Sequence, residues 1–511
     1  MNVGEISLEG ISKRYGSVQA VDDVSVVIRP GAVTAIVGEN GAGKSTLVKI
    51  LAGVVEKDAG TIRRDGQVLD LTSARVAAQS GIGMVFQEMA LVPELTVWEN
   101  VCLGWETVTG GRLARREIVR RVGDVSAEFG LPIRPESLVR DLPVSLRQRV
   151  EILKVLYRSV DTIIFDEPTG ILTPQEAESL FKAIDTLRES GKSVVFISHK
   201  LNEVLRLADM IYVMRRGQLV AETEPGDLTP RALAKLMLGE ELPTINKEQQ
   251  PLGAVAVQLD GIKVWNDEGS RQLGPFDLKL NFGEVLGIAG VAGSGQDELV
   301  SVISGLAPPL SGEISISKGD GELTPYPWAG STTPRRLRDL GLRSSPSDRN
   351  EEATVATKPL WFSAVGVDYD NPRFYRRGFF NVVAARQHTD DLIKRGVVKS
   401  DGPDVLPGSL SGGNLQKFIV ARDLGARPRV AVLEEPTRGI DIGSAMRIRA
   451  EIRQAAASGD ACILVSSDLD EIFQVSDRIA VLYNGHLVGV YAADSVTTEE
   501  IGAAMTGLME S

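Results

Sequence analysis

The sequence has few of the features that mark secreted or membrane-spanning proteins. It holds only two cysteines, Cys102 and Cys462, which lie far apart and form no metal-binding spacing. We expect both to be small buried hydrophobic residues in a reducing cytosolic compartment. No stretch approaches the ~18 consecutive apolar residues of a membrane span, and residues 1–16 lack the apolar core of a signal peptide. If the protein works at a membrane, we expect it to dock onto other subunits.

Basic residues are in the minority. The chain has 68 acidic and 56 basic residues, a formal net charge of -12, which argues against a broad surface for nucleic-acid backbones. Its composition, 43% hydrophobic and 24% charged, is typical of globular proteins and excludes the disordered class. A chain of 511 residues is too long for one hydrophobic core, so we expect more than one domain.

The same order of features occurs twice along the chain. FDEPTGILT at 165–173 matches LEEPTRGID at 433–441, a shift of 268 (433 minus 165). ADMIYVMRRGQLV at 208–220 matches SDRIAVLYNGHLV at 476–488 with the same shift, 476 minus 208. A repeat of this length indicates two related domains and excludes a short solenoid period.

Short apolar runs alternate with helical segments in both halves, for example TAIVG and SVVFIS, then VLGIAG and ACILVS. This alternation predicts an α/β protein whose two domains, 1–240 and 255–511, each have a mainly parallel sheet. The polar stretch 241–254 is the predicted linker. The glycine-rich stretches that begin at residues 38 and 290 are only 252 residues apart, 290 minus 38. Because the later motifs are shifted by 268, the second half holds about 16 extra residues between its glycine-rich stretch and those motifs. We place these residues at 318–334.

A complete phosphate-binding loop stands in the first half. GENGAGKS follows an apolar strand and precedes a helical segment, which is the context that a P-loop requires. Its glycines let backbone N–H groups point at phosphates, Lys44 reaches the terminal phosphates, and the Ser45 hydroxyl ligates Mg²⁺. The residues expected to hold the phosphates are Gly38, Glu39, Asn40, Gly41, Ala42, Gly43, Lys44, Ser45 and Thr46.

Two adjacent carboxylates end a later apolar strand, IIFDEP. Asp166 is placed to hold the water shell of the metal, and Glu167 to orient and deprotonate the attacking water in phosphoryl transfer. An isolated acidic pair is more often simply solvated, but the position after a buried strand in a P-loop protein favours catalysis. His199 ends the next apolar strand, and a contact with the terminal phosphate is favoured there over a purely structural role.

The second half repeats this set with substitutions. The loop GVAGSGQD keeps its glycines, but glutamine and aspartate replace the lysine and the serine. Later, a glutamate replaces the metal-site aspartate and a serine replaces the histidine, while the second carboxylate persists. We call this second set the degenerate site. Its residues are the loop glycines Gly290, Gly293 and Gly295, the loop substitutions Gln296 and Asp297, the later substitutions Glu434 and Ser467, and the retained carboxylate Glu435.

These motifs resemble those of the ATP-binding cassette family over essentially the whole chain. The resemblance implies ATP as the nucleotide, with Mg²⁺, and an antiparallel β subdomain and a helical subdomain beside each parallel sheet. It also implies that Gln87 in GMVFQEM is a catalytic-site residue that senses the metal and the transmembrane partner. Tyr15 in KRYG matches the aromatic residue that stacks on adenine, although a plain strand aromatic is the alternative.

LSGGNLQK at 410–417 is similar to the family signature LSGGQ, whose serine and backbone amides grip the γ-phosphate bound by another domain. The matching residues are Ser411, Gly412, Gly413 and Asn414. In the first half, Pro143 stands where the signature serine belongs, with Ser145 and Leu146 at the last two positions. Proline offers neither a hydroxyl nor an N–H donor.

Because cassettes of this family pair head to tail, the resemblance implies that the first P-loop faces the second signature. That pairing within one chain gathers every intact motif in one composite site and every substitution in the other, whereas random decay would scatter them. Each lost charged hydrogen bond costs roughly 1.5–3 kcal/mol, so we expect the second site to be nearly inert. It is either a regulatory pocket that still binds nucleotide or a pure dimerisation scaffold.

Among tandem cassettes, the chain looks like the ATP-binding subunit of a bacterial importer for sugars or nucleosides. PSDR at 346–349 resembles the PEDR segment of that group, with Ser347 in place of the acidic residue. Residues 142–158 and 167–176 look more like the nucleoside branch, and we favour nucleosides over sugars. The resemblance implies a place on the cytoplasmic face of the membrane, two permease subunits contacted through residues 88–101, and a substrate-binding lipoprotein.

Two other functions compete with import. A soluble twin-cassette ATPase that acts on ribosomes or DNA would typically carry two intact sites, a long charged linker or zinc-binding insertions, and often a basic balance. A scaffold that does not hydrolyse ATP would require the loss of Glu167, which is present.

Overall fold

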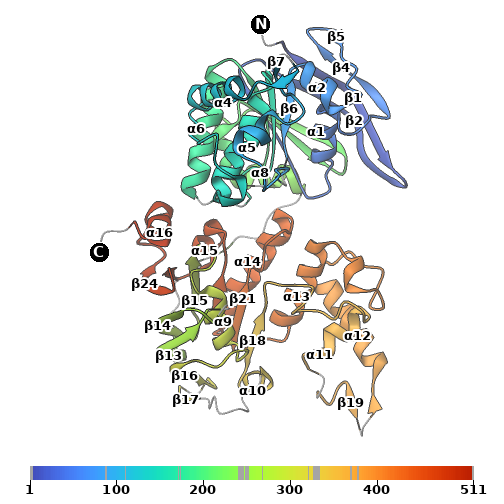
Figure 1. Ribbon diagram of the computed structural model, residues 1–511. Helices are drawn as coiled ribbons and strands as arrows, with labels where there is room; N and C mark the ends of the chain where they lie inside the picture. The colour runs from blue at the N-terminus through green and yellow to red at the C-terminus, as the bar shows by residue number, and fades with distance from the viewer. Residues whose placement is uncertain are drawn as a thin grey trace. The chain divides into compact units, whose positions relative to one another are not determined.

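The computed structural model divides into two compact units, Met1–Leu242 and Pro243–Ser511, each a layered α/β domain (Figure 1). Most of the predicted linker 241–254 and the middle of the predicted insertion 318–334 lie outside the described residues, and the predicted domain boundaries stay predictions. The structure describes residues 4–86, 89–109, 111–170, 172, 174–198, 200–239, 245, 247, 252–266, 269–319, 321–325, 334–368, 371–376 and 379–508.

The first unit is built on a six-stranded sheet. Neighbouring strands are parallel except for the β11–β12 pair, which is antiparallel. Every residue of β3, β9 and β10 is buried, as expected for parallel strands covered on both faces. In order across the sheet, the strands are β12 (Gln218–Thr223), β11 (Met210–Arg215), β3 (Val33–Gly38), β10 (Ser193–Ile197), β9 (Thr162–Asp166) and β6 (Ile82–Val85).

An antiparallel sheet and a set of helices complete the first unit (Figure 1). The antiparallel sheet consists of β2 (Val18–Ile28), β1 (Ile6–Tyr15), β4 (Ala59–Arg64) and β5 (Gln67–Val68), and a small hairpin pairs β7 (Val108–Thr109) with β8 (Arg112–Leu113). The helices are α1 (Lys44–Leu51), α2 (Ala74–Gln79), α3 (Val97–Cys102), α4 (Arg115–Glu128), α5 (Val144–Leu156), α6 (Pro174–Glu189), α7 (Leu201–Leu207) and α8 (Pro230–Leu238), with a 3₁₀ turn at Val139–Asp141.

The second unit repeats this topology. Its six strands follow the same order as their counterparts, and the pair β23–β24 is again antiparallel. The strands of the main sheet are β24 (His486–Ala492), β23 (Arg478–Tyr483), β15 (Val285–Gly290), β22 (Ala461–Val465), β21 (Val430–Glu434) and β18 (Leu342–Ser345). The antiparallel sheet consists of β14 (Gln272–Asn281), β13 (Val255–Trp265), β16 (Ser311–Ser317) and β17 (Leu323–Pro325), and β19 (Tyr375–Arg376) pairs with β20 (Phe379–Phe380).

The helices of the second unit fall into two groups. In Figure 1, α11, α12 and α13 stand together beside the sheet, and they share a core of their own around Leu360, Ala385 and Phe418. The helices are α9 (Gln296–Ile303), α10 (Pro334–Asp339), α11 (Leu360–Gly366), α12 (Val382–Arg395), α13 (Gly412–Gly425), α14 (Ile442–Ala457), α15 (Leu469–Val475) and α16 (Thr498–Met505), with a 3₁₀ turn at Pro407–Ser409.

Cys102 and Cys462 are buried and unpaired with each other, as expected. Across the described part of the chain, every helix is too short or too polar to cross a bilayer.

Candidate functional site

The first P-loop connects β3 to α1 and is closed by its own lysine. Lys44 Nζ donates to the carbonyl oxygens of Gly38, at 2.8 Å, and of Glu39, at 3.0 Å. Gly43 has φ 100° at the start of α1, and a Cβ there would lie 2.2 Å from the Ala20 carbonyl oxygen, so only glycine fits. The loop therefore holds a buried ammonium group where the phosphates of a nucleotide would lie.

The carboxyl ends of neighbouring parallel strands bring the metal-site residues together. Ile197 at the end of β10 is in register with both Ile36 of β3 and Asp166 of β9. Consequently, Ser45 Oγ at the start of α1 donates to Asp166 Oδ1 at 3.3 Å. A hydroxyl and a carboxylate side by side are the oxygen donors that suit Mg²⁺ bound together with phosphate groups, so these residues fit the expected ion.

The charges of this site perturb one another. Burial lowers the pKa of Lys44, while the Glu167, Asp166 and Glu39 carboxylates oppose that shift. Burial also raises the pKa of Asp166, and Glu167 adds to the rise. Burial thus disfavours the charged forms of both Lys44 and Asp166. A bound phosphate would stabilise the charge of the lysine, and a bound cation would stabilise the charge of the carboxylate.

Glu167 is held by a strained turn at the end of β9. Its φ is 49°, a left-handed conformation that costs a non-glycine residue of order 1–3 kcal/mol, and its N–H donates to the Ile197 carbonyl at 2.9 Å. The residues that follow are fixed by a buried glutamate, Glu203, which accepts from Thr169 Oγ1 at 2.7 Å and from Ser198 Oγ at 2.8 Å. These two hydrogen bonds therefore hold the residues that follow Glu167 in place.

The sequence analysis did not identify this buried glutamate, although the repeat contained it. Glu471 matches Glu203 with the common shift of 268 (471 minus 203) and accepts from Thr437 Oγ1 and Ser466 Oγ, both at 2.7 Å. A glutamate that recurs at one repeat position on a helix was the signal.

The remaining site residues predicted in the first unit lie in β1, in the P-loop and in α1, or fall outside the described residues. Tyr15 ends β1 with 48% of its surface exposed, and Lys13 Nζ lies 5.7 Å from its ring centroid. Asn40 and Gly41 lie in the loop, and Thr46 in the first turn of α1. Gln87 and His199 lie outside the described residues, so their roles stay predictions.

In the second unit, the loop keeps its shape without a cation. Gly293 and Gly295 have φ 80° and 104°, and the loop again runs from the end of β15, at Gly290, into an eight-residue helix. Gln296 takes the place of the lysine and donates through Nε2 to the Val291 carbonyl at 3.2 Å. A neutral amide therefore closes this loop, and Asp297 brings a negative charge into the first turn of α9.

Several carboxylates converge near this second loop. Burial raises the pKa of Glu434 to about 8, and the neighbouring Asp297, Glu352 and Glu435 carboxylates add to the shift. Such a cluster disfavours further negative charge. In this loop glutamine therefore replaces the cation, and acidic side chains lie close by.

Glu435 matches Glu167, but Ser467 binds its carboxylate. Both glutamates have left-handed backbones, with φ 46° at Glu435. Ser467 donates to the Glu435 carboxylate through its N–H at 2.7 Å and through Oγ at 3.1 Å. These two bonds compete with any water that the carboxylate would otherwise activate.

The signature serine caps the start of α13. Ser411 Oγ accepts from the Asn414 N–H at 3.4 Å and from Asn414 Nδ2 at 2.9 Å, and Gly412 and Gly413 form the first turn. The N-terminus of a 14-residue helix presents N–H groups that suit a phosphate.

In the first unit, Pro143 occupies the cap position of α5, with no side-chain hydrogen bond. Leu146 lies in the first turn of that helix and donates its N–H to the Pro143 carbonyl, and Ser145 belongs to the same turn. The contrast between the two signatures is therefore a contrast between two helix caps. The pairing of the first P-loop with the second signature stays a prediction.

Comparison with known proteins places the chain. The family model described as ABC transporter matches residues 21–170 and 273–438. The nucleoside import ATP-binding protein NupA of Lactococcus lactis subsp. cremoris is 36% identical over 98% of each chain. The glucose import ATP-binding protein TsgD13 of Haloferax volcanii is 37% identical over 98% of this chain and 96% of its own.

A solved structure agrees on the fold. The RNase-L Inhibitor structure covers 95% of this chain and 90% of its own, with a TM-score of 0.63 at 20% identity, which shows the fold alone. The repeated P-loop topology, the intact first loop and the family match together identify this chain as an ATP-binding ATPase that belongs to the ABC transporter family.

Proposed function

We propose that this chain is the ATP-hydrolysing subunit of an importer that carries a nucleoside across the cell membrane. The observation that carries the proposal is the segregation of the motifs: Lys44, Ser45, Asp166 and Glu167 are complete in one unit, and the serine cap of the signature is complete in the other. Hydrolysis at one composite site per chain follows from this arrangement when the two units pair head to tail.

In this mechanism, the residues of the first unit bind and activate. Lys44 would release its loop carbonyls and bind the terminal phosphates, and Ser45 and Asp166 would hold Mg²⁺, which would neutralise phosphate charge. Glu167 orients the attacking water and accepts its proton. The predicted partners of these groups are Gln87 and His199.

The signature of the second unit completes the mechanism. Ser411 and the N–H groups of Gly412 and Gly413 donate to the γ-phosphate in the paired state, and Asn414 holds the serine in place. Donors fixed in advance stabilise charge as it develops in phosphoryl transfer. Hydrolysis removes the group that both units hold, so the pair opens again.

The proposed partners are two permease subunits and, through them, a substrate-binding protein outside the cell. Residues 88–101 of the first unit are the proposed contact, and the chain would lie on the cytoplasmic face as a peripheral subunit. NupA supports a nucleoside as the cargo, as do the sequence likenesses at 142–158 and 167–176. TsgD13, a glucose import ATP-binding protein, makes a sugar the second candidate.

The test combines reconstitution with substitution. The chain, coexpressed with candidate permease and binding-protein subunits from the same genome, is placed in proteoliposomes, and ATP-dependent uptake of radiolabelled nucleosides and monosaccharides is compared. Nucleoside uptake that vanishes with Lys44→Ala supports the proposal. Uptake of sugars alone makes the cargo wrong, and copurification with ribosomes in place of permeases makes import wrong.

A further inference from the structure

One arginine of the second unit joins two loops that are remote in sequence. Arg349 belongs to the PSDR segment that follows β18. Its Nη1 donates to the Gly412 carbonyl at 2.9 Å, and its Nη2 donates to the Arg438 carbonyl. Gly412 directly follows the signature serine, and Arg438 lies three residues after Glu435.

The guanidinium group fills the space between these loops. A Cβ on Gly412 would lie 3.2 Å from Arg349 Nη1, and one on Gly439 would lie 3.5 Å from Nη2. Arginine presents several N–H donors in a rigid planar fork, so it can bond two carbonyls at once, whereas lysine is a point donor. Two charge-assisted bonds from one rigid group define the distance between the loops.

The arginine is itself anchored. Its carbonyl accepts from Thr354 Oγ1 at 2.9 Å, and the preceding Asp348 carboxylate accepts from the N–H groups of Asn350 and Glu351, both at 2.9 Å. These bonds fix the backbone on both sides of Arg349. The segment 348–354 that carries the fork is therefore closed by its own hydrogen bonds.

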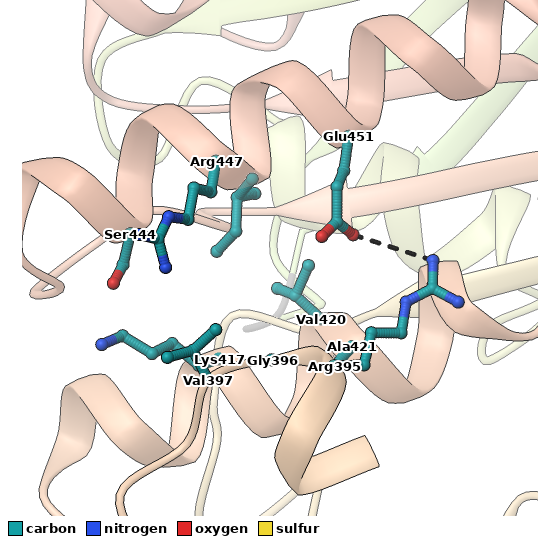
Figure 2. Close-up of a pocket in the computed structure, with 10 residues that line it drawn as sticks. Arg395, Gly396, Val397, Lys417, Val420, Ala421, Ser444, Arg447 and Glu451 are labelled. Atoms are coloured by element: carbon teal, nitrogen blue, oxygen red, sulfur yellow. Dashed lines mark ion pairs between the residues drawn. The ribbon is translucent and has the colours of Figure 1, made fainter. Parts of the chain in front are cut away.

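A second contact ties the signature helix to the same region. Lys417 Nζ on α13 lies 2.8 Å from Asp441 Oδ2, and Asp441 caps α14 by accepting from the Ser444 N–H at 2.8 Å. Figure 2 shows Lys417 on α13 and Ser444 on α14 facing each other across a small pocket. The helix is thus fixed at its side as well as at its first residue.

The equivalent position of the first unit holds a residue that cannot make these bonds. β6 and β18 match with a shift of 260 (342 minus 82), so Met89 stands at the position of Arg349. A methionine side chain has no N–H to donate. The arginine thus accompanies the intact signature, and a methionine accompanies the one with Pro143.

We propose that Arg349 is a positioning residue for ATP hydrolysis: it fixes the signature loop against the loop after Glu435, so that Ser411 and the amides beside it are held ready for the γ-phosphate. This inference rests on the proposed function, because it assigns the second signature to the nucleotide of the first P-loop. Arg349 itself acts through Gly412 and does not need to touch the nucleotide.

The experiment compares Arg349→Ala and Arg349→Lys with the wild-type full chain. Arg386→Ala is the matched control, since Arg386 is exposed and pairs with Asp404 on the surface, where such a pair contributes little. We expect Arg349→Ala to lower kcat about tenfold or more, as the loss of a charged hydrogen bond does. Binding of a fluorescent ATP analogue to the first loop should stay within about twofold of wild type, whereas a general structural defect would reduce both.

The lysine variant keeps the charge and bonds one carbonyl, so its kcat should lie between those of wild type and alanine. The inference is overturned if Arg349→Ala keeps wild-type kcat, or if its kcat and its analogue affinity fall in parallel. If the alanine variant melts well below wild type, the lysine variant decides, and a wild-type kcat there overturns the inference. Turnover that survives Lys44→Ala would instead refute the proposed function, whatever Arg349 does.

Discussion

The two P-loops of this chain have the same backbone and different chemistry. Gly43 and Gly295 both adopt left-handed conformations, with φ 100° and 104°, and each precedes an eight-residue helix. Yet Lys44 closes the first loop with a buried ammonium and Gln296 closes the second with an amide. The comparison shows that the turn depends on its glycines, so catalytic side chains can be lost while the fold persists.

The charges around the two loops differ more than the backbone shapes of the loops do. In the first unit a lysine stands among the acids, and in the second the acids face one another. Burial raises the pKa of Glu434 to about 8, and the neighbouring Asp297, Glu352 and Glu435 carboxylates add to the rise. Substitutions in either loop test this difference in charge.

The largest expected effect separates the loops directly. Lys44→Ala or Glu167→Gln should lower steady-state ATP turnover by at least about 100-fold, because each removes a group that acts on the reacting phosphate or water. The equivalent change in the second loop, Gln296→Ala, should leave turnover within about twofold. Comparable losses from all three variants would refute the asymmetry.

The next effect tests the helix caps. Ser411→Ala removes the cap and a predicted γ-phosphate donor, so kcat should fall about tenfold. Pro143→Ala, at the equivalent position of the first unit, is the matched control and should change kcat by less than about twofold. Equal losses from both variants would show that both signatures contribute to turnover.

A smaller effect concerns nucleotide stoichiometry. Gln296→Lys returns a cation to the second loop, where it would face Asp297 and Glu434, so it should strengthen nucleotide binding there. Equilibrium dialysis with a slowly hydrolysed ATP analogue should show at least about tenfold tighter binding at the second site, with no gain in turnover, because Ser467 still binds Glu435. Unchanged binding would mean that the lost lysine is not what limits this site.

The sequence predicted the parts of this molecule that local patterns encode. The strand–loop–helix units, the repeat and the carboxylates at strand ends follow from periodicity, glycine placement and adjacency in sequence. The Arg349 bonds could not be predicted, because the carbonyls they reach are 63 and 89 residues away and any residue type supplies a carbonyl. The shifted pKa of Glu434 likewise depends on Asp297 and Glu352, which only folding brings near.

The smallest expected effect is on stability, and its sign follows from proton linkage. Native Glu434 holds its proton to about pH 8, whereas an unfolded glutamate releases it near pH 4.3. Between these values the native state binds more protons than the unfolded state, so this residue lowers the free energy of unfolding as pH rises, and the loss is complete above about pH 8. Glu434→Gln removes the titrating group and should abolish that loss.

Calorimetry of the full chain measures this effect. Relief of this loss should raise the Tm of the second unit by at least about 4 °C at pH 8.5, whereas at pH 5 the variant and wild type should differ by much less. Glu313→Gln, which changes an exposed glutamate of β16, should shift Tm little at either pH. A gain for Glu434→Gln that is equal at both pH values would mean that packing, and not the buried charge, distinguishes the two side chains. The acidic cluster would then not lower the stability of the native state. The contrast between the two loops would reduce to the lost lysine alone.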